Sequence, residues 1–240
     1  MKYGVVRAVS AAALLATFGG AAHAQDVTVS FKGTITTYDS QYENPFPDLT
    51  VGTPFTGYYT YSLATPETNS LPEVGDYWHS SAPYGVTVTI GNRTFKSNPA
   101  NVSFIVELVN DYYNQDNFVF HSYNNLDVDG APVQFISFQL DDFSQTALTD
   151  VNLPSTALNL SNWTQTFGLN ISASVYSPTY MSYFIRGNVE QMQLGMGLYV
   201  PPANPPAPTG PAGPPGPAGA TGEKSEQGAA GLPTATGAQR

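Results

Sequence analysis

The stretch DVTVSFKGTI, residues 26–35, alternates apolar and polar side chains and decides the fold class. Val27, Val29 and Phe31 fall on one face of an extended chain, and the residues between them are polar. A period of two is typical of a β-strand with one face buried in a core. The stretch therefore predicts a β-strand with one buried face.

Eight further runs rich in threonine, valine, tyrosine and phenylalanine follow the same pattern, as expected for strands. They are Phe55–Leu63, Val86–Ile90, Thr94–Lys96, Val102–Val109, Phe118–Tyr123, Pro132–Leu140, Leu169–Tyr176 and Tyr183–Leu194. Gly91-Asn92 and Asp129-Gly130 are typical of tight hairpin turns. No amphipathic helix longer than a turn or two is evident. Eight or nine short strands predict an all-β domain over residues 25–199, an antiparallel β-sandwich or jelly roll, with a closed barrel as the alternative.

The N-terminus has the pattern of an export signal. Met1-Lys2 and Arg7 supply positive charge, an apolar run follows, and Ala22-His23-Ala24 fits a small-x-small cleavage site. A membrane anchor is the alternative, but the apolar run is shorter than the roughly 20 residues that a spanning helix needs. We expect a signal peptide over residues 1–24, a secreted, extracellular or cell-envelope location, and no integral membrane span.

Charge and cysteine content narrow the class of protein further. The chain carries 8 basic and 18 acidic residues, so removal of Lys2 and Arg7 moves the net charge from −10 to −12. Nucleic-acid binding is not expected, because phosphate contacts need Lys and Arg. Cysteine is absent, so disulfides cannot add to the stability of the core.

The C-terminal composition changes abruptly. Residues 200–209 are proline-rich and predict a stiff linker, and residues 210–240 repeat glycine at every third position. Ser225, Thr234 and Arg240 interrupt this period. Only glycine fits at the axis of a collagen triple helix, so the period predicts a collagen-like tail and a homotrimer, with a disordered tail as the alternative. The triple-helix glycines would be Gly210, Gly213, Gly216, Gly219, Gly222, Gly228, Gly231 and Gly237.

The segment Asn125–Gly130 places oxygen-bearing side chains at alternate positions before a glycine. Asn125, Asp127 and Asp129 match the opening of a calcium loop, which makes them candidate metal ligands and calcium a candidate cofactor. The twelfth position, where such a loop needs a bidentate Glu, is Ile136. A plain Asp-Gly turn explains the same residues.

Catalytic signatures are lacking. His79 and His121 are the histidines of the mature chain, and neither belongs to a recognisable catalytic motif. Both are expected to be packed or lone polar residues, and acidic positions such as Asp111, Asp116 and Asp141-Asp142 are expected to be scattered surface carboxylates. The sequence therefore predicts a protein that is not an enzyme. Core packing or stacking on sugars would account for the aromatic residues of the first half: Tyr58, Tyr59, Tyr61, Tyr77, Trp78, Tyr84, Tyr112 and Tyr113.

Residues 26–195 resemble the β-rich domain of exported bacterial proteins that are sorted by a PEP-CTERM tail. The phrases that carry the resemblance are VGTPFTGYYTY at 51–61, VTVTIG at 86–91, LDDFSQTAL at 140–148 and Leu153-Pro154. Such a resemblance implies an extracellular or envelope location. The chain departs from that family after residue 200, where a Val-Pro-Glu-Pro motif, an apolar helix and an arginine cluster are replaced by the glycine repeat. This tail resembles that of bacterial collagen-like proteins.

These features predict a secreted, non-enzymatic structural or adhesive protein. Its β-sandwich head would be displayed on a collagen-like tail, with a surface glycan or matrix component as partner. The alternative is a carbohydrate- or calcium-dependent binding module with a disordered tail.

Overall fold

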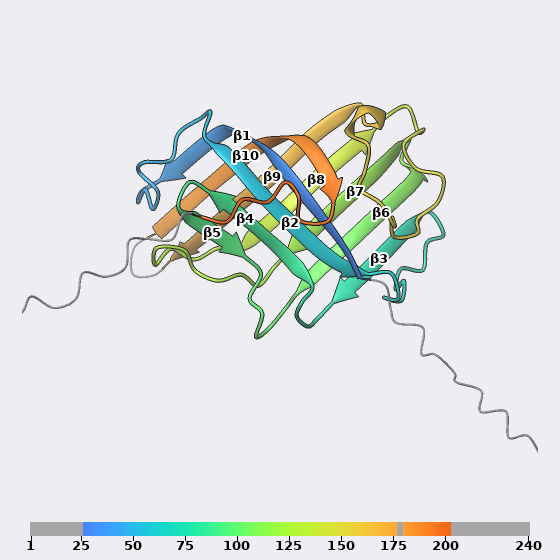
Figure 1. Ribbon diagram of the computed structural model, residues 1–240, viewed down its shortest axis with the longest axis horizontal. Coiled ribbons are helices and arrows are strands. Elements are labelled where there is room, and N and C mark those ends of the chain that lie inside the picture. Colours follow the sequence, from blue (N-terminus) through green and yellow to red (C-terminus); the bar gives the residue numbers. More distant parts are fainter. Residues whose placement is uncertain (1–25, 177–179, 203–240) are drawn as a thin grey trace, which may run out of the picture. The chain divides into compact units, whose positions relative to one another are not determined.

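The computed structural model describes residues 26–176 and 180–202, and these residues form an all-β domain (Figure 1). The regular element besides the strands is one turn of 3-10 helix, η1 (Leu160–Asn162). The strands are β1 (Asp26–Gln41), β2 (Pro54–Ser62), β3 (Val74–His79), β4 (Gly85–Ile90), β5 (Arg93–Lys96), β6 (Phe104–Tyr112), β7 (Gln115–Ser122), β8 (Phe135–Asp142), β9 (Gln165–Tyr176) and β10 (Tyr180–Leu194).

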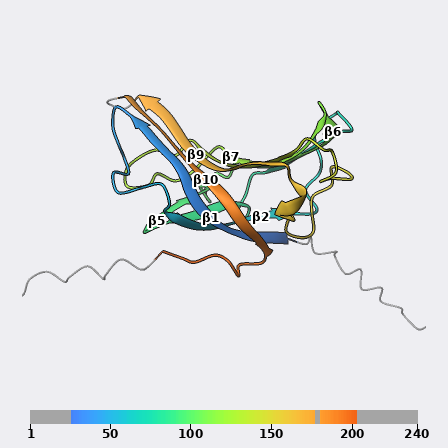
Figure 2. The same ribbon diagram turned by 90° about the horizontal axis from the view of Figure 1, so that it is seen from above.

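All ten strands belong to one antiparallel sheet in the order β3-β6-β7-β8-β9-β10-β1-β2-β4-β5. The long strand β1 pairs with β2 through its first half and with β10 from Ser30 onward. Its register with β10 shifts at Lys32/Gly33 and at Ile35/Thr37, and such bulges bend a strand. The sheet folds over at this point, so that β1 and β2 lie beneath β7 and β9 in Figure 2.

The core fills the space between the two layers. The ring of Phe31 on β1 lies 6.3 Å from Phe55 within its own layer, and 6.4 Å from both Phe120 and Phe138 of the other layer. Each of these side chains is at most 2% exposed. Burial of one such ring stabilises the fold by roughly 1.5–3 kcal/mol, so this aromatic contact between layers holds the sheet in its folded-over form.

Loops cover both edges of the sheet. Along β5, the backbone of Leu126 donates a hydrogen bond to the Lys96 carbonyl, and an isolated bridge joins Ser97 to Asn125. Along β3, the Thr68 amide donates to the carbonyl of Asp76. Covered edges lack the free backbone groups that promote aggregation.

After β10 the chain crosses the outer face of the layer formed by β1, β2 and β4. We call residues 195–200 the strap. The amide of Ser30 donates to the carbonyl of Gly195, and Thr56 Oγ1 bonds both the amide and the carbonyl of Val200 at 3.1 Å. The Tyr199 ring also meets Tyr58 edge-on at 4.9 Å. Val200, which the sequence assigns to the linker, is thus still held by the domain.

The predicted all-β sandwich is confirmed, and it is built from a single folded sheet. Every predicted run contains a strand, but the predicted count of eight or nine was too low, because Val74–His79 was missed. The turn at Gly91-Asn92 joins β4 to β5 as predicted. Asp129-Gly130 also forms a tight turn, closed by the Val128–Ala131 bridge, within the connection from β7 to β8. The predicted signal peptide, most of the linker and the glycine tail lie outside the described residues.

Candidate functional site

One surface of the sandwich is curved inward. It is the outer face of the layer β3-β6-β7-β8-β9-β10, which Figure 2 shows with β9 and β6 raised on either side of β7. Ile105 and Val119 point to this outer face and do not belong to the core, yet they are only 5% and 4% exposed. Neighbouring side chains therefore surround them. We call this surface the concave face.

Strand register places one row of side chains across the whole concave face. Directly opposed residues of antiparallel strands point the same way, with Cβ atoms about 5 Å apart. From β3 to β10 the row consists of Trp78, Ile105, His121, Ser137, Asn170 and Arg186. It runs from an aromatic side chain at one end, through polar groups, to a cation at the other.

Three exposed aromatic rings form a continuous rim beside this row. Trp78, Tyr123 and Phe135 are 47%, 43% and 41% exposed. Trp78 and Tyr123 are stacked at 5.9 Å, and Tyr123 meets Phe135 edge-on at 5.5 Å. We call these three residues the aromatic rim. Apolar surface left in contact with water in this ordered form is typical of a binding site.

His121 extends the rim toward the floor of the concave face. Its ring lies 5.6 Å from that of Tyr123. Burial lowers the pKa of His121, so the imidazole is neutral at neutral pH and offers one hydrogen-bond donor and one acceptor.

Two hollows of the concave face share Gln139 in their lining. The larger, of about 420 Å³, is lined by Glu107, Asn117 and His121 among others, and by the tyrosines of the β6–β7 turn. The smaller, of about 230 Å³, lies over β8, β9 and β10 and includes Arg186. Because Gln139 lines both, the two hollows form one continuous polar surface.

A buried carboxylate fixes two amides of this surface. Asp141 is 1% exposed and accepts hydrogen bonds from Gln139 Nε2 at 3.1 Å and from the Asn117 side-chain amide. Asn117 Nδ2 also donates to the Leu140 carbonyl at 3.2 Å. Both amides are held in place before any ligand arrives, which lowers the entropic cost of binding.

Two carboxyl groups meet at the β3 end of the concave face. Asp76 lies directly opposite Glu107 in the register of β3 and β6. Asp76 Oδ2 accepts a hydrogen bond from Asn69, whereas Asp76 Oδ1 is buried with no donor from the described chain. Burial, and next the charge of Asp76, raise the pKa of the Glu107 carboxyl. When Glu107 is protonated, its O–H can donate to the unpartnered Asp76 Oδ1.

Two of the three predicted calcium ligands, Asn125 and Asp129, make other contacts, although Asn125 Oδ1 has no hydrogen-bond partner in the described chain. The Asn125 amide donates to three backbone carbonyls, at distances from 3.0 to 3.3 Å, and Asp129 forms an ion pair of 2.6 Å with Arg93. The Arg93 guanidinium also donates two hydrogen bonds to the Asp48 carboxylate. Within residues 26–176 and 180–202, three or more His, Cys, Asp or Glu side chains nowhere form a metal-binding group. Calcium at Asn125, Asp127 and Asp129 stays a prediction, and it would require Arg93 to release Asp129.

His79 is a packed residue, as predicted. Its Nδ1 donates to the Tyr77 carbonyl at 3.1 Å, and its Nε2 accepts from the Ser62 amide at 3.1 Å. Of the acidic positions that were expected at the surface, Asp111 is exposed, whereas Asp116, Asp141 and Asp142 are buried and were wrongly taken for surface groups. Asp142 accepts hydrogen bonds from the backbone of Ser144 at 3.0 Å and of Thr146 at 2.8 Å, and so orders the loop after β8.

The eight aromatic residues named above for the first half of the chain divide between the core and the surface. Tyr59, Tyr61 and Tyr77 are buried, whereas Trp78 and Tyr113 are exposed on or beside the concave face. The other members of the rim, Tyr123 and Phe135, lie outside that group. Their alternation within strands gives no sign of which face they take, because that depends on the register of neighbouring strands.

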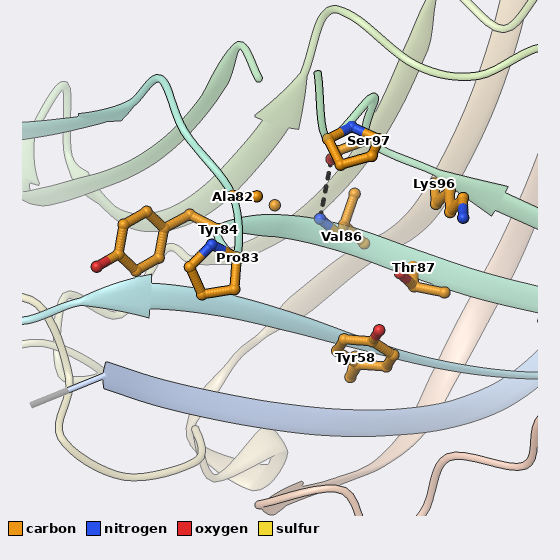
Figure 3. A pocket seen from close by; sticks show the side chains of 10 residues that line it. Tyr58, Ala82, Pro83, Tyr84, Val86, Thr87, Lys96 and Ser97 are labelled. Atoms are coloured by element: carbon orange, nitrogen blue, oxygen red, sulfur yellow. Dashed lines mark hydrogen bonds between the residues drawn. The ribbon is translucent and has the colours of Figure 1, made fainter. Parts of the chain in front are cut away.

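A separate hollow of about 190 Å³ lies on the opposite layer (Figure 3). Tyr58, Thr87 and Lys96 line it from β2, β4 and β5. Its deepest polar group, Ser97 Oγ, accepts from the Val86 amide at 3.0 Å and bonds Ser122 at 2.7 Å. This hollow is small, and its best-placed hydroxyl already serves the fold, so we place the candidate site on the concave face.

Comparison with known proteins gave no match: no family model, no curated protein and no solved structure is similar to this chain. Helices with the length and apolar character needed to cross a bilayer are absent from the described part of the chain.

Proposed function

We propose that this chain is an exported, non-enzymatic adhesive protein whose β-sandwich head binds a polysaccharide along the concave face. The observation that carries the proposal is the aromatic rim beside a row of polar side chains. The C–H faces of a sugar ring pack on the faces of aromatic rings, and its hydroxyl groups need donors and acceptors at the side. Trp78 and Tyr123 supply the first, and His121, Ser137 and Asn170 supply the second.

The shape of the site also favours an extended chain. The polar part of the row crosses four strands from β7 to β10, which amounts to about 14 Å at roughly 4.8 Å per strand spacing. Several sugar units fit along such a length. A single small ligand would need a deeper and more enclosed cavity.

We do not propose that the protein hydrolyses the polysaccharide, although two carboxyl groups, Asp76 and Glu107, lie together on the same face. A glycosidase places its two carboxyl groups roughly 5–10 Å apart, on opposite sides of the bond to be cut. Asp76 and Glu107 instead lie directly opposite each other on neighbouring strands, where the charge of Asp76 adds to burial in raising the pKa of Glu107. We expect no cleavage when the protein is incubated with the polysaccharide that it binds.

Sequence features outside the described residues supply the display element of the proposal. The signal peptide at residues 1–24 would export the chain, and the glycine period from Gly210 to Gly237 would join three chains. Three linked heads bind a repetitive polysaccharide more tightly than one head does, without any new contact.

Affinity measurements on the full mature chain test the binding part. We expect Trp78→Ala and Tyr123→Ala each to weaken binding to the recognised polysaccharide up to about tenfold, since stacking on one ring contributes about 0.5–1.5 kcal/mol. Phe143→Ala is the matched control, because Phe143 is 55% exposed and lines neither hollow of the concave face. Equal losses in all three variants, or none in the rim variants, would contradict the proposal.

A further inference from the structure

The hollow over β8, β9 and β10 gathers hydrogen-bond donors around a cation. Ser137, Gln139, Asn170 and Arg186 line it. Ser137 and Asn170 are neighbours in the register of β8 and β9, and Asn170 lies opposite Arg186 on β10. Hydroxyl, amide and guanidinium groups on three adjacent strands therefore reach the same space.

Arg186 has no carboxylate partner within the described residues, in a chain with more than twice as many acidic as basic residues. The ion pairs found there both belong to Arg93. The contact made by the Arg186 guanidinium is with the ring of Phe184, at 5.1 Å. A planar guanidinium with free N–H groups is suited to two parallel hydrogen bonds with a carboxylate.

A glycine, Gly168, and an exposed aromatic ring, Phe167, also line this hollow. Gly168 has a φ of +66°, and a Cβ at that position would lie 2.2 Å from the carbonyl oxygen of Gly187. Glycine is therefore required at this position in the lining of the hollow. Phe167 beside it is 53% exposed and lines the hollow, where it offers a flat apolar surface to a sugar ring.

We propose that this hollow is a subsite for a uronic acid residue, whose carboxylate binds Arg186 while Ser137 and Asn170 bind neighbouring hydroxyl groups. The inference rests on the proposed function and deepens it, since it assigns the bound polysaccharide to the acidic class.

The acidic pair on the same face does not cancel this preference. Glu107 on β6 is separated from Arg186 on β10 by four strand spacings, about 19 Å along the sheet. The Debye length at physiological ionic strength is about 8 Å, so the two charges act independently there. The net negative charge of the domain is screened in the same way, and repulsion of an acidic chain is expected only at low salt.

The experiment compares matched ligands on the full mature chain. Hexamers of galacturonate, glucuronate and mannuronate are each titrated alongside their carboxyl-reduced counterparts, at 0.15 M salt. In at least one pair, we expect the acidic hexamer to bind about tenfold more tightly, as one charge-assisted hydrogen bond would give. Arg186→Gln removes this preference and leaves the affinity for the reduced hexamer unchanged. Arg186→Lys keeps part of the preference for the acidic hexamer, because Lys retains the positive charge but lacks the planar guanidinium that donates two parallel hydrogen bonds.

Lys32→Gln is the control for loss of one positive charge, because Lys32 is exposed on β1 and lines neither hollow of the concave face. Melting temperatures of all variants exclude misfolding. A reduced hexamer that binds as well as the acidic one, and loses affinity in Trp78→Ala, overturns the subsite and leaves the proposed function standing. A preference that survives Arg186→Gln also overturns the subsite. If no member of any pair binds, both inferences fall.

Discussion

Glu107 and Asp76 show how one pair of side chains couples the concave face to pH. Like charges placed directly opposite each other in a sheet are destabilising. Because its pKa is raised by burial and by Asp76, Glu107 holds its proton more tightly in the folded protein than in the unfolded chain. The stabilisation from this proton is complete below the ordinary carboxyl pKa of about 4.3, and it is lost as the pH rises through the raised pKa of the folded state.

The direction of this pH dependence of stability can be tested with a single substitution. Glu107→Gln places a neutral amide donor opposite the unpartnered Asp76 Oδ1, so we expect it to raise the free energy of unfolding by about 1 kcal/mol at pH 7. The melting temperature should rise by about 2–4 °C at pH 7 and by much less at pH 4, where wild-type Glu107 regains its proton. Thermal unfolding at the two pH values measures both, with the exposed Glu73→Gln as control. A variant that is less stable than the wild type at pH 7 would refute the repulsion between Glu107 and Asp76.

At the scale of the strands, alternation of side chains predicted which segments are extended, but not which of them are neighbours. The run at residues 26–35 became β1 as expected, since burial of one face needs only a period of two. β3 escaped prediction because Gly75 and Asp76 interrupt its short apolar pattern. The concave face was beyond prediction for another reason. Its row combines one residue from each of six strands, and register between distant segments is not written in any one of them.

The fold in β1 depends on a glycine that local sequence does not explain. A Cβ on Gly33 would lie 1.9 Å from the carbonyl oxygen of Asn188 on β10, a contact that only a backbone shift can relieve. We expect Gly33→Ala to destabilise the domain by about 3 kcal/mol or more, as overpacking at the bulge separates β1 from β10.

Gly91→Ala is the comparison, because nothing lies within 4 Å of a Cβ there and only its positive φ of +60° is unfavourable, by about 1–2 kcal/mol. Urea unfolding of both variants separates the two costs. Similar losses would mean that the close approach of β1 and β10 is not what holds the bend.

At the scale of the whole molecule, we propose a binding head that is connected to a trimerising tail. The uninterrupted glycine period runs from Gly210 to Gly222, and Ser225 breaks it. Gly216→Ala should reduce the mass of the full mature chain in solution from three chains to one, because one such substitution disrupts a short triple helix. Ser225→Gly should act in the opposite sense and raise the melting temperature of the trimer. Light scattering and circular dichroism measure these effects, and a single-chain mass in all three proteins would exclude trimer formation.

The strap determines where a mechanical load would enter the head. Tension on residues beyond Pro202 first meets the two hydrogen bonds between Val200 and Thr56, and then β2 and β1. Between Ser30 and Thr34, β1 is paired with β10 on one side and with β2 on the other, so this part of the strand cannot be peeled away one hydrogen bond at a time from an open edge. The strap lies on the layer opposite the concave face. A bound polymer and a pulling tail would therefore act on different layers, and the aromatic contacts of Phe31 would carry the force between them.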